Sequence, residues 1–202
     1  MEQTQQPVQP VQPTQPQYSF PTEEVTLPSK GLLYPEGSPL RSGKITMKYM
    51  TAKEEDILTN QNYIKNGTVI DKLLQSLIVD MTKVEDLLIG DKNAVLVAAR
   101  ILGYGQDYTF KYPHPDTGVE EELTIDLTEA EDKLIDESKM VNGKNEFEFE
   151  LPTSKMFITF KLLTQADEKK IEQELKGLKK INKNSSPELT TRLKHVIQSV
   201  NG

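Results

Sequence analysis

LPSKGLLYPEGSPL occupies residues 27–40 and carries five large apolar side chains among three prolines and two glycines. Proline and glycine interrupt helices and long strands, so no regular element can gather these side chains on one face. Strands are expected on either side, at residues 22–27 and 44–50. Two interpretations of the segment remain open: a loop that folds back on the core of the chain, or a surface that binds another protein. On the second interpretation, the candidate partner-binding residues are Leu32, Leu33, Tyr34 and Leu40.

The first nineteen residues of the chain, 1–19, are dominated by glutamine and proline. Prolines recur at every third position, and this spacing favours an extended polyproline II conformation. The stretch has too few apolar side chains to offset the entropy of ordering, so we predict a disordered tail that acts as a flexible tether. A proline-rich ligand is the alternative, although no basic residue flanks the repeat.

Overall charge and composition argue against several classes of function. The 202 residues carry a net charge of −7 with a sequence pI of about 5.0, whereas phosphate binding needs clustered lysine and arginine. No apolar run approaches the roughly 18 residues that span a bilayer. The absence of cysteine leaves no disulfide framework and no thiolate. The sequence therefore predicts a soluble intracellular protein that binds neither nucleic acid nor a membrane.

Residues 51–104 are predicted to form a helical part. Thr51 followed by Glu54 is the capping-box pattern that begins a helix, and we expect this helix to continue to Gly67. A second, amphipathic helix is predicted over residues 68–78, where apolar side chains recur at helical spacing. Two helices joined at Gly67 would form a helical hairpin.

The third predicted helix covers residues 91–105, where Asp91 is expected to act as the cap. Its side chains are apolar almost all round, so it should be the most buried of the helices. Arg100 is its only charge past the first turn, and an arginine in such surroundings should reach a carboxylate or a partner. Arg100 and Tyr104 therefore complete the set of candidate partner-binding residues.

Two strand pairs follow, each with apolar residues at alternate positions. Residues 107–127 and 145–163 are predicted to form antiparallel hairpins. We therefore predict an α+β fold in which a helical subdomain packs on antiparallel β-hairpins, with C-terminal helices and a disordered N-terminal tail. The expected division of the chain is a tail at 1–19, an α+β core at 20–163 and C-terminal helices at 164–202.

Groups suited to catalysis are scarce in the sequence. Its two histidines are His114, in a proline-bounded turn, and His195, on a predicted helix, and neither has the partners that a base or a zinc site requires. Carboxylates are numerous, but they lie on outward strand faces or in charged helices, where solvation explains them. We therefore predict no catalytic residue, no cofactor, no metal site and no enzymatic activity. A hydrolase that uses acidic residues near His114 is a third hypothesis.

Residues 27–104 carry a family resemblance. The resemblance lies in the strings LPSKGLLYPEGSPL, GKITMKYMTAKEEDILTNQNYIKNGTVIDKLLQSLI and LLIGDKNAVLVAARILGYG. This part of the chain resembles the T4-type phage baseplate hub assembly proteins, also described as tail assembly chaperones. The resemblance continues more loosely to TTRLKHVIQSVNG. It implies a non-enzymatic protein that binds baseplate hub or tape-measure subunits in the host cell cytoplasm during tail assembly. A structural subunit retained in the virion baseplate is the alternative.

The chain departs from the resembled family in two places. Some members carry a cysteine pair at the turn that here reads HPDTG, residues 114–118, so the resemblance transfers no metal site. Members also continue beyond the position of Gly202, and we therefore expect a C-terminal segment that is missing or separately encoded.

Overall fold

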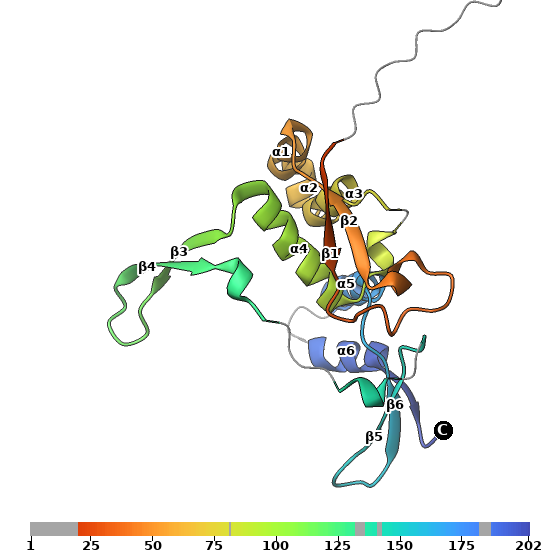
Figure 1. The fold of residues 1–202 in the computed structure, drawn as a ribbon. Helices are drawn as coiled ribbons and strands as arrows, with labels where there is room; N and C mark the ends of the chain where they lie inside the picture. Colours follow the sequence, from red (N-terminus) through yellow and green to blue (C-terminus); the bar gives the residue numbers. More distant parts are fainter. Residues whose placement is uncertain (1–19, 81, 132–135, 141–142, 182–186) are drawn as a thin grey trace, which may run out of the picture.

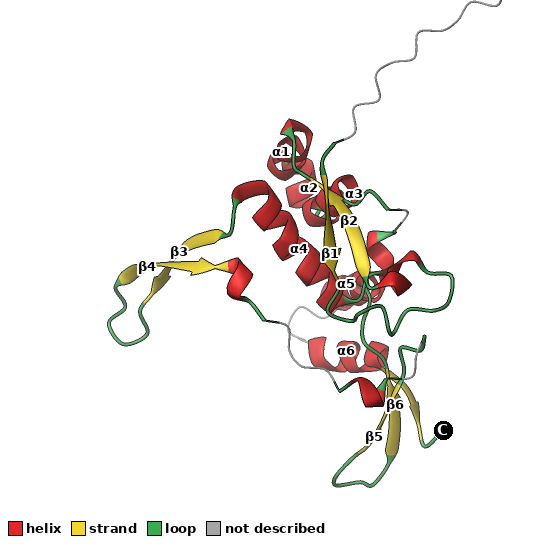
Figure 2. Cartoon of the chain, in the orientation of Figure 1, coloured by secondary structure: helices red, strands yellow, loops and turns green. Residues whose placement is uncertain are grey.

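The structure of the chain is a computed structural model that describes residues 20–80, 82–131, 136–140, 143–181 and 187–202. It has an α+β fold, as predicted: six α-helices of the described residues accompany short antiparallel sheets and hairpins (Figure 1, Figure 2). The predicted disordered tail, residues 1–19, lies outside the described residues. Within them, no helix combines the length and the apolar character needed to cross a bilayer.

The two strands expected around residues 27–40 are confirmed. β1 (Thr22–Thr26) and β2 (Lys44–Lys48) pair antiparallel, so the loop between them leaves and returns at the same end of the pair. Gly31 adopts a positive φ of 75°, and a Cβ at this position would collide with the backbone carbonyl of Arg41. Glycine is therefore required where the two sides of the loop approach each other.

The helical part follows the predicted order. Its capping box is confirmed, because the carboxylate of Glu54 accepts a hydrogen bond from the amide of Thr51 at 2.9 Å. The single helix expected up to Gly67 is wrong: Asn60 ends the first helix, and its side chain caps a second, short one. The elements up to residue 104 are η1 (Pro39–Ser42), α1 (Ala52–Thr59), α2 (Gln61–Lys65), α3 (Val69–Leu77), η2 (Val84–Asp86) and α4 (Ile89–Tyr104).

The main hydrophobic core lies between the loop of residues 27–40, strand β2 and helices α3 and α4. The loop is part of this core, as the first of the two interpretations of its sequence expected. The most buried apolar side chains of this core, each no more than 1% exposed, include Leu27, Leu40, Ile45, Met47, Leu74, Leu77, Val84, Leu87 and Val95.

Helix α4 is not the most buried helix, contrary to the expectation from its composition. Only Asp91, Val95 and Ala99 are buried on it, and Val97 remains 38% exposed. The shorter α3 buries more of its apolar side chains. An apolar composition all round a helix does not by itself supply neighbours on every side, and the fold covers α4 mainly along one stripe.

The C-terminal part combines helices with a three-stranded sheet. Both predicted hairpins and the C-terminal helices are confirmed, but the last of these helices ends at Val196 and residues 197–200 pair with β6 as a third strand, which we did not predict. The elements are β3 (Asp107–Pro113), β4 (Glu120–Asp126), η3 (Leu127–Glu129), η4 (Glu137–Lys139), β5 (Phe147–Glu150), β6 (Phe157–Phe160), α5 (Gln165–Ile181), α6 (Glu188–Val196) and β7 (Ile197–Val200).

A network of charged side chains holds α5 on the helical part. Lys169 of α5 lies 2.9 Å from both Asp71 of α3 and Glu85 of η2, and Lys92 of α4 lies 3.1 Å from Asp71. Burial alone would raise the pKa of Asp71, but hydrogen bonds from the two lysines outweigh it and lower the pKa. The expected division of the chain at residue 164 stays a prediction, and these contacts join the two sides of that boundary.

Neighbouring leucines of the loop provide a matched test of its burial. Leu33 is 3% exposed and lies in the core, whereas Leu32 is only half-buried. We expect Leu33→Ala to lower the free energy of unfolding by ~2–5 kcal/mol, as truncation of a buried leucine does, and Leu32→Ala to lower it by about 1 kcal/mol. Urea unfolding of both variants measures the difference. Equal losses would contradict the packing described for the loop.

The buried carboxylate of Glu54 predicts a pH dependence of stability. Burial alone would raise the pKa of Glu54, but hydrogen bonds from Lys48, Ser76 and Thr51 outweigh it and lower the pKa from 4.5 to about 2. A lowered folded-state pKa stabilises the fold above pH 4.5, and this stabilisation is lost as the pH falls toward 2.

Urea unfolding at neutral pH and near pH 3 measures this effect. The wild type should lose about 2 kcal/mol more than Glu54→Gln between these conditions, because the glutamine does not titrate. Glu36→Gln, at an exposed position of the loop, is the control and should follow the wild type. A Glu54→Gln variant with the same acid sensitivity as the wild type would exclude this role for Glu54.

Candidate functional site

Asp91 is the polar centre at which the loop meets α4. Its side chain is 1% exposed and accepts three hydrogen bonds: from the amide of Ser29 at 2.9 Å, from the Ser29 hydroxyl at 2.6 Å and from the Tyr34 hydroxyl at 2.6 Å. The expectation that Asp91 caps α4 is wrong, because the helix begins two residues earlier, at Ile89. It lies in the first turn instead, where the positive end of the helix dipole stabilises its charge.

Tyr34 extends this arrangement by one further hydrogen bond. Its hydroxyl accepts from the amide of Leu88 at 2.9 Å while it donates to Asp91. Burial raises the pKa of Tyr34 well above its usual range, and the hydrogen bond to Asp91 raises it further. The hydroxyl therefore stays protonated at physiological pH and remains a donor to the carboxylate.

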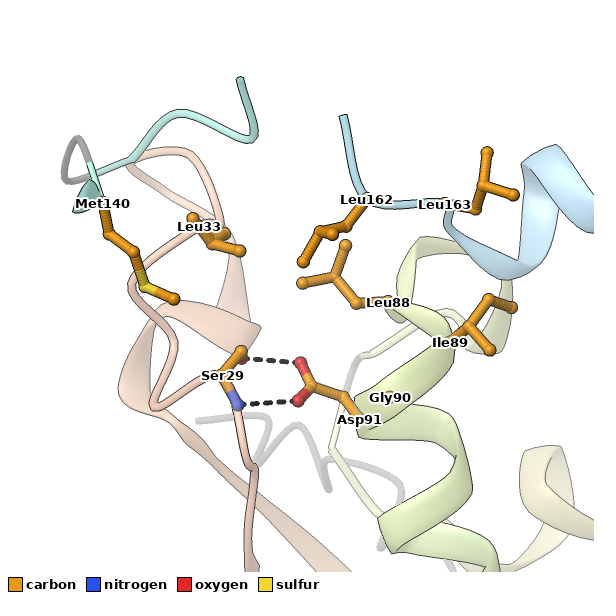
Figure 3. Close-up of a pocket in the computed structure, with 9 residues that line it drawn as sticks. All are labelled: Ser29, Leu33, Leu88, Ile89, Gly90, Asp91, Met140, Leu162 and Leu163. Carbon is orange, nitrogen blue, oxygen red and sulfur yellow. Dashed lines mark hydrogen bonds between the residues drawn. The ribbon is translucent and has the colours of Figure 1, made fainter. Parts of the chain in front are cut away.

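A cavity of about 320 Å³ lies beside Asp91 (Figure 3). The figure shows Leu33 and Met140 on one side and Leu88, Leu162 and Leu163 on the other. All of these lining side chains are apolar, and both oxygens of Asp91 are already occupied by the loop. The arrangement fits a structural role in holding the loop against α4.

The four predicted partner-binding residues of the loop lie in or beside the core. Leu33, Tyr34 and Leu40 are 3%, 5% and 1% exposed, and Leu32 is half-buried. The backbone of Leu32 is also engaged, because its carbonyl accepts from Arg41 at 3.1 Å. Partner binding by these side chains stays a prediction, and it would require the loop to leave the core.

Arg100 lies at the other end of α4, where it braces the next hairpin. Its guanidinium donates to the backbone carbonyls of Gly105 at 2.9 Å and Asp107 at 3.2 Å. It also lies over the rings of Tyr104 and Tyr108, at 5.0 and 5.6 Å from their centroids. We expected a carboxylate or a partner, and the structure shows two backbone carbonyls just past the end of α4.

Tyr104 presents an exposed ring whose hydroxyl is engaged. The side chain is 50% exposed, and its hydroxyl donates to the carboxylate of Glu55 on α1 at 2.6 Å. That hydrogen bond raises the pKa of Tyr104. Arg100 and Tyr104, chosen from the sequence as partner-binding candidates, are thus brought together at the base of the β3–β4 hairpin.

The β3–β4 hairpin, residues 107–126, is here called the arm, and Figure 1 shows it extending away from the helices. One face of the arm carries Tyr108 opposite Ile125, Phe110 opposite Leu123 and Tyr112 opposite Glu121. The aromatic rings follow one another with centroids 5.8 and 6.1 Å apart. The other face is polar, with a hydrogen bond of 2.8 Å between the hydroxyls of Thr109 and Thr124.

The apolar face of the arm consists of Tyr108, Phe110, Tyr112, Leu123 and Ile125, and much of it is open to solvent. Tyr108, Leu123 and Ile125 are 42%, 42% and 40% exposed. Sequence reasoning identified the alternation but not the exposure, because the same pattern is typical of strands whose apolar face is covered. No local signal distinguishes a face with a neighbour from a face without one.

The two histidines occupy different surroundings. His114 lies in the turn of the arm, where its Nδ1 accepts from the amide of Asp116 at 3.3 Å. His195 on α6 lies 3.0 Å from the carboxylate of Glu174 on α5. In the part of the chain that the structure describes, no three His, Cys, Asp or Glu side chains are grouped so that they could hold a metal ion.

The brace formed by Arg100 predicts the rigidity of the arm. Arg100→Ala removes two hydrogen bonds and two ring contacts, so we expect a loss of about 1 kcal/mol in unfolding free energy and faster amide hydrogen exchange at the arm's base. Arg100→Lys keeps the charge but not the planar fork, and should give an intermediate exchange rate. Exchange rates in Arg100→Ala equal to those of the wild type would show that the brace does not hold the arm.

Comparison with known proteins identifies the family. A family model described as T4 bacteriophage base plate protein matches residues 21–198, from the start of β1 into β7. No curated protein and no solved structure matches the chain. The match confirms the resemblance at the level of the baseplate family. It does not test the more specific assignment to hub assembly. Because the matched residues make up most of the sequence, the chain belongs to the T4 bacteriophage base plate protein family.

Proposed function

We propose that the chain acts without catalysis, by binding other proteins during assembly of the phage tail baseplate. Its partners on this proposal are the baseplate hub or tape-measure subunits, and it acts in the host cell cytoplasm. Membership of the baseplate family over residues 21–198 is the observation that carries the proposal.

The surface of the described chain supports binding as the mode of action. The arm presents side chains of the kind that protein interfaces use, with three aromatic rings and two aliphatic residues on one face. Exposed apolar patches of this kind on a soluble protein typically mark sites of association. An assembly protein needs such surfaces and no chemistry of its own.

A structural subunit that stays in the virion baseplate is the second candidate function. Among the described strands, β3 and β4 pair only with each other, and β5 and β7 lie at the two edges of their sheet. Open strand edges can accept a strand from a neighbouring subunit by backbone hydrogen bonding. This observation favours a permanent place in the particle as much as a transient role.

Quantitative mass spectrometry of purified phage particles beside infected-cell lysate separates the two candidates. An assembly protein that acts and leaves should be abundant in the lysate and absent from the particles. A constant copy number per particle would instead support the structural subunit, since a permanent part is present at fixed stoichiometry.

Co-expression pull-downs test the partners themselves. The full chain should retain at least one hub or tape-measure subunit of the same phage. The matched negative control is an unrelated acidic protein with a similar net charge. If no hub or tape-measure subunit is retained above this control, the proposed partners are wrong.

A further inference from the structure

We propose that the arm is the docking element of the chain, and that its occupant is a baseplate protein with an apolar groove flanked by lysine or arginine side chains. The inference rests on the proposed function, because it names the surface and the kind of partner through which that function is exercised. Three features of the arm support the inference: its apolar face, its braced base and its charge.

The apolar face makes the arm a poor structure to leave uncovered in water. A two-stranded hairpin is at best marginally stable alone, and a third strand or a packed helix usually covers its apolar side. Tyr108, Leu123 and Ile125 nevertheless remain about two-fifths exposed. From residue 108 to residue 112, the strip is about 14 Å long at ~3.4 Å per residue. A groove of similar length on another protein would bury it.

The base of the arm is already ordered before any partner binds. Arg100 donates to the carbonyls of Gly105 and Asp107, and the amide of Leu127 donates to the carbonyl of Gln106 at 3.0 Å, just beyond the ends of the two strands. A preorganised element loses little conformational entropy on binding, so more of the contact free energy appears as affinity. A docking element benefits from such a brace, whereas a passive surface loop has no need of one.

The charge of the arm specifies the chemistry of the groove. Residues 107–126 contain six acidic side chains and one lysine. Glu121 lies on the apolar face, opposite Tyr112, whereas Glu120 and Glu122 project to the polar face, where Glu122 is opposite Lys111. Basic side chains beside an apolar groove would complement the net negative charge of the arm, accelerate association and make it sensitive to salt.

Other occupants fit the charge less well. Two copies of the chain that met arm to arm would bring two negatively charged arms together, which costs free energy by like-charge repulsion. The N-terminal segment of residues 1–19 contains no lysine or arginine, so it does not complement the arm either. A different protein with a basic rim is the occupant that the arm's own chemistry selects.

Isothermal titration of the full chain with each purified baseplate protein of the same phage, at low and at high NaCl, tests the inference. Leu123→Ser with Ile125→Ser removes part of the apolar face and should weaken binding about tenfold or more. Thr109→Ser with Thr124→Ser, on the polar face, is the matched control and should bind like the wild type. Glutamine at positions 120–122 should weaken binding at low NaCl and flatten its salt dependence.

The outcomes separate this inference from the function on which it rests. If no baseplate protein binds the wild type, the proposed function fails and the inference with it. If one binds the wild type, but the Leu123→Ser with Ile125→Ser variant and the glutamine variant bind it as well as the wild type at both NaCl concentrations, only docking through the arm is excluded. If circular dichroism shows that the variant with Leu123→Ser and Ile125→Ser is unfolded, the glutamine variant decides alone. Sedimentation measures self-association. If the wild type self-associates and the variant with Leu123→Ser and Ile125→Ser does not, a second copy is the occupant and the inference is overturned.

Discussion

The buried carboxylate of Asp91 is the interaction on which the arrangement of the chain depends. An ionised carboxylate is costly to bury, and here three hydrogen bonds from Ser29 and Tyr34 offset that cost. All three donors come from residues 27–40, so the loop cannot leave α4 without stranding the charge. The loop is therefore held in the core by a polar anchor, although its prolines and glycines prevent a helix or a strand.

Helix α4 connects this anchor to the arm. Asp91 lies in its first turn and Tyr104 at its last residue, about 20 Å apart along the helix axis. The first turn faces the loop, and the C-terminal part of the helix supplies Arg100 and Tyr104 at the arm's base. A single rigid element thus has one buried end and one exposed end. This explains why a helix so apolar in composition is not buried all round.

The distribution of apolar side chains distinguishes two parts of the molecule that differ in exposure. In the core, Leu40 of the loop, Leu74 of α3 and Leu87 just after η2 are removed from water almost completely. On the arm, aromatic and aliphatic side chains of the same character stay in contact with water. Burial of the first set stabilises the fold, and the second set leaves free energy available for association. A member of a baseplate family, whose setting is an assembly of many proteins, has an evident use for such a surface.

Local rules were sufficient for the α+β class, the two hairpins and the capping box at Thr51 and Glu54. These features depend on spacings of two to four residues, which the chain itself sets. The burial of Leu33, Tyr34 and Leu40, the role of Asp91, the strand β7 and the exposure of the arm could not be obtained in this way. Ser29 and Asp91 are 62 residues apart, and β7 pairs with a strand from before α5. An alternating pattern shows that one face of a strand can be buried, but only the packing of distant segments determines whether anything lies there to cover it.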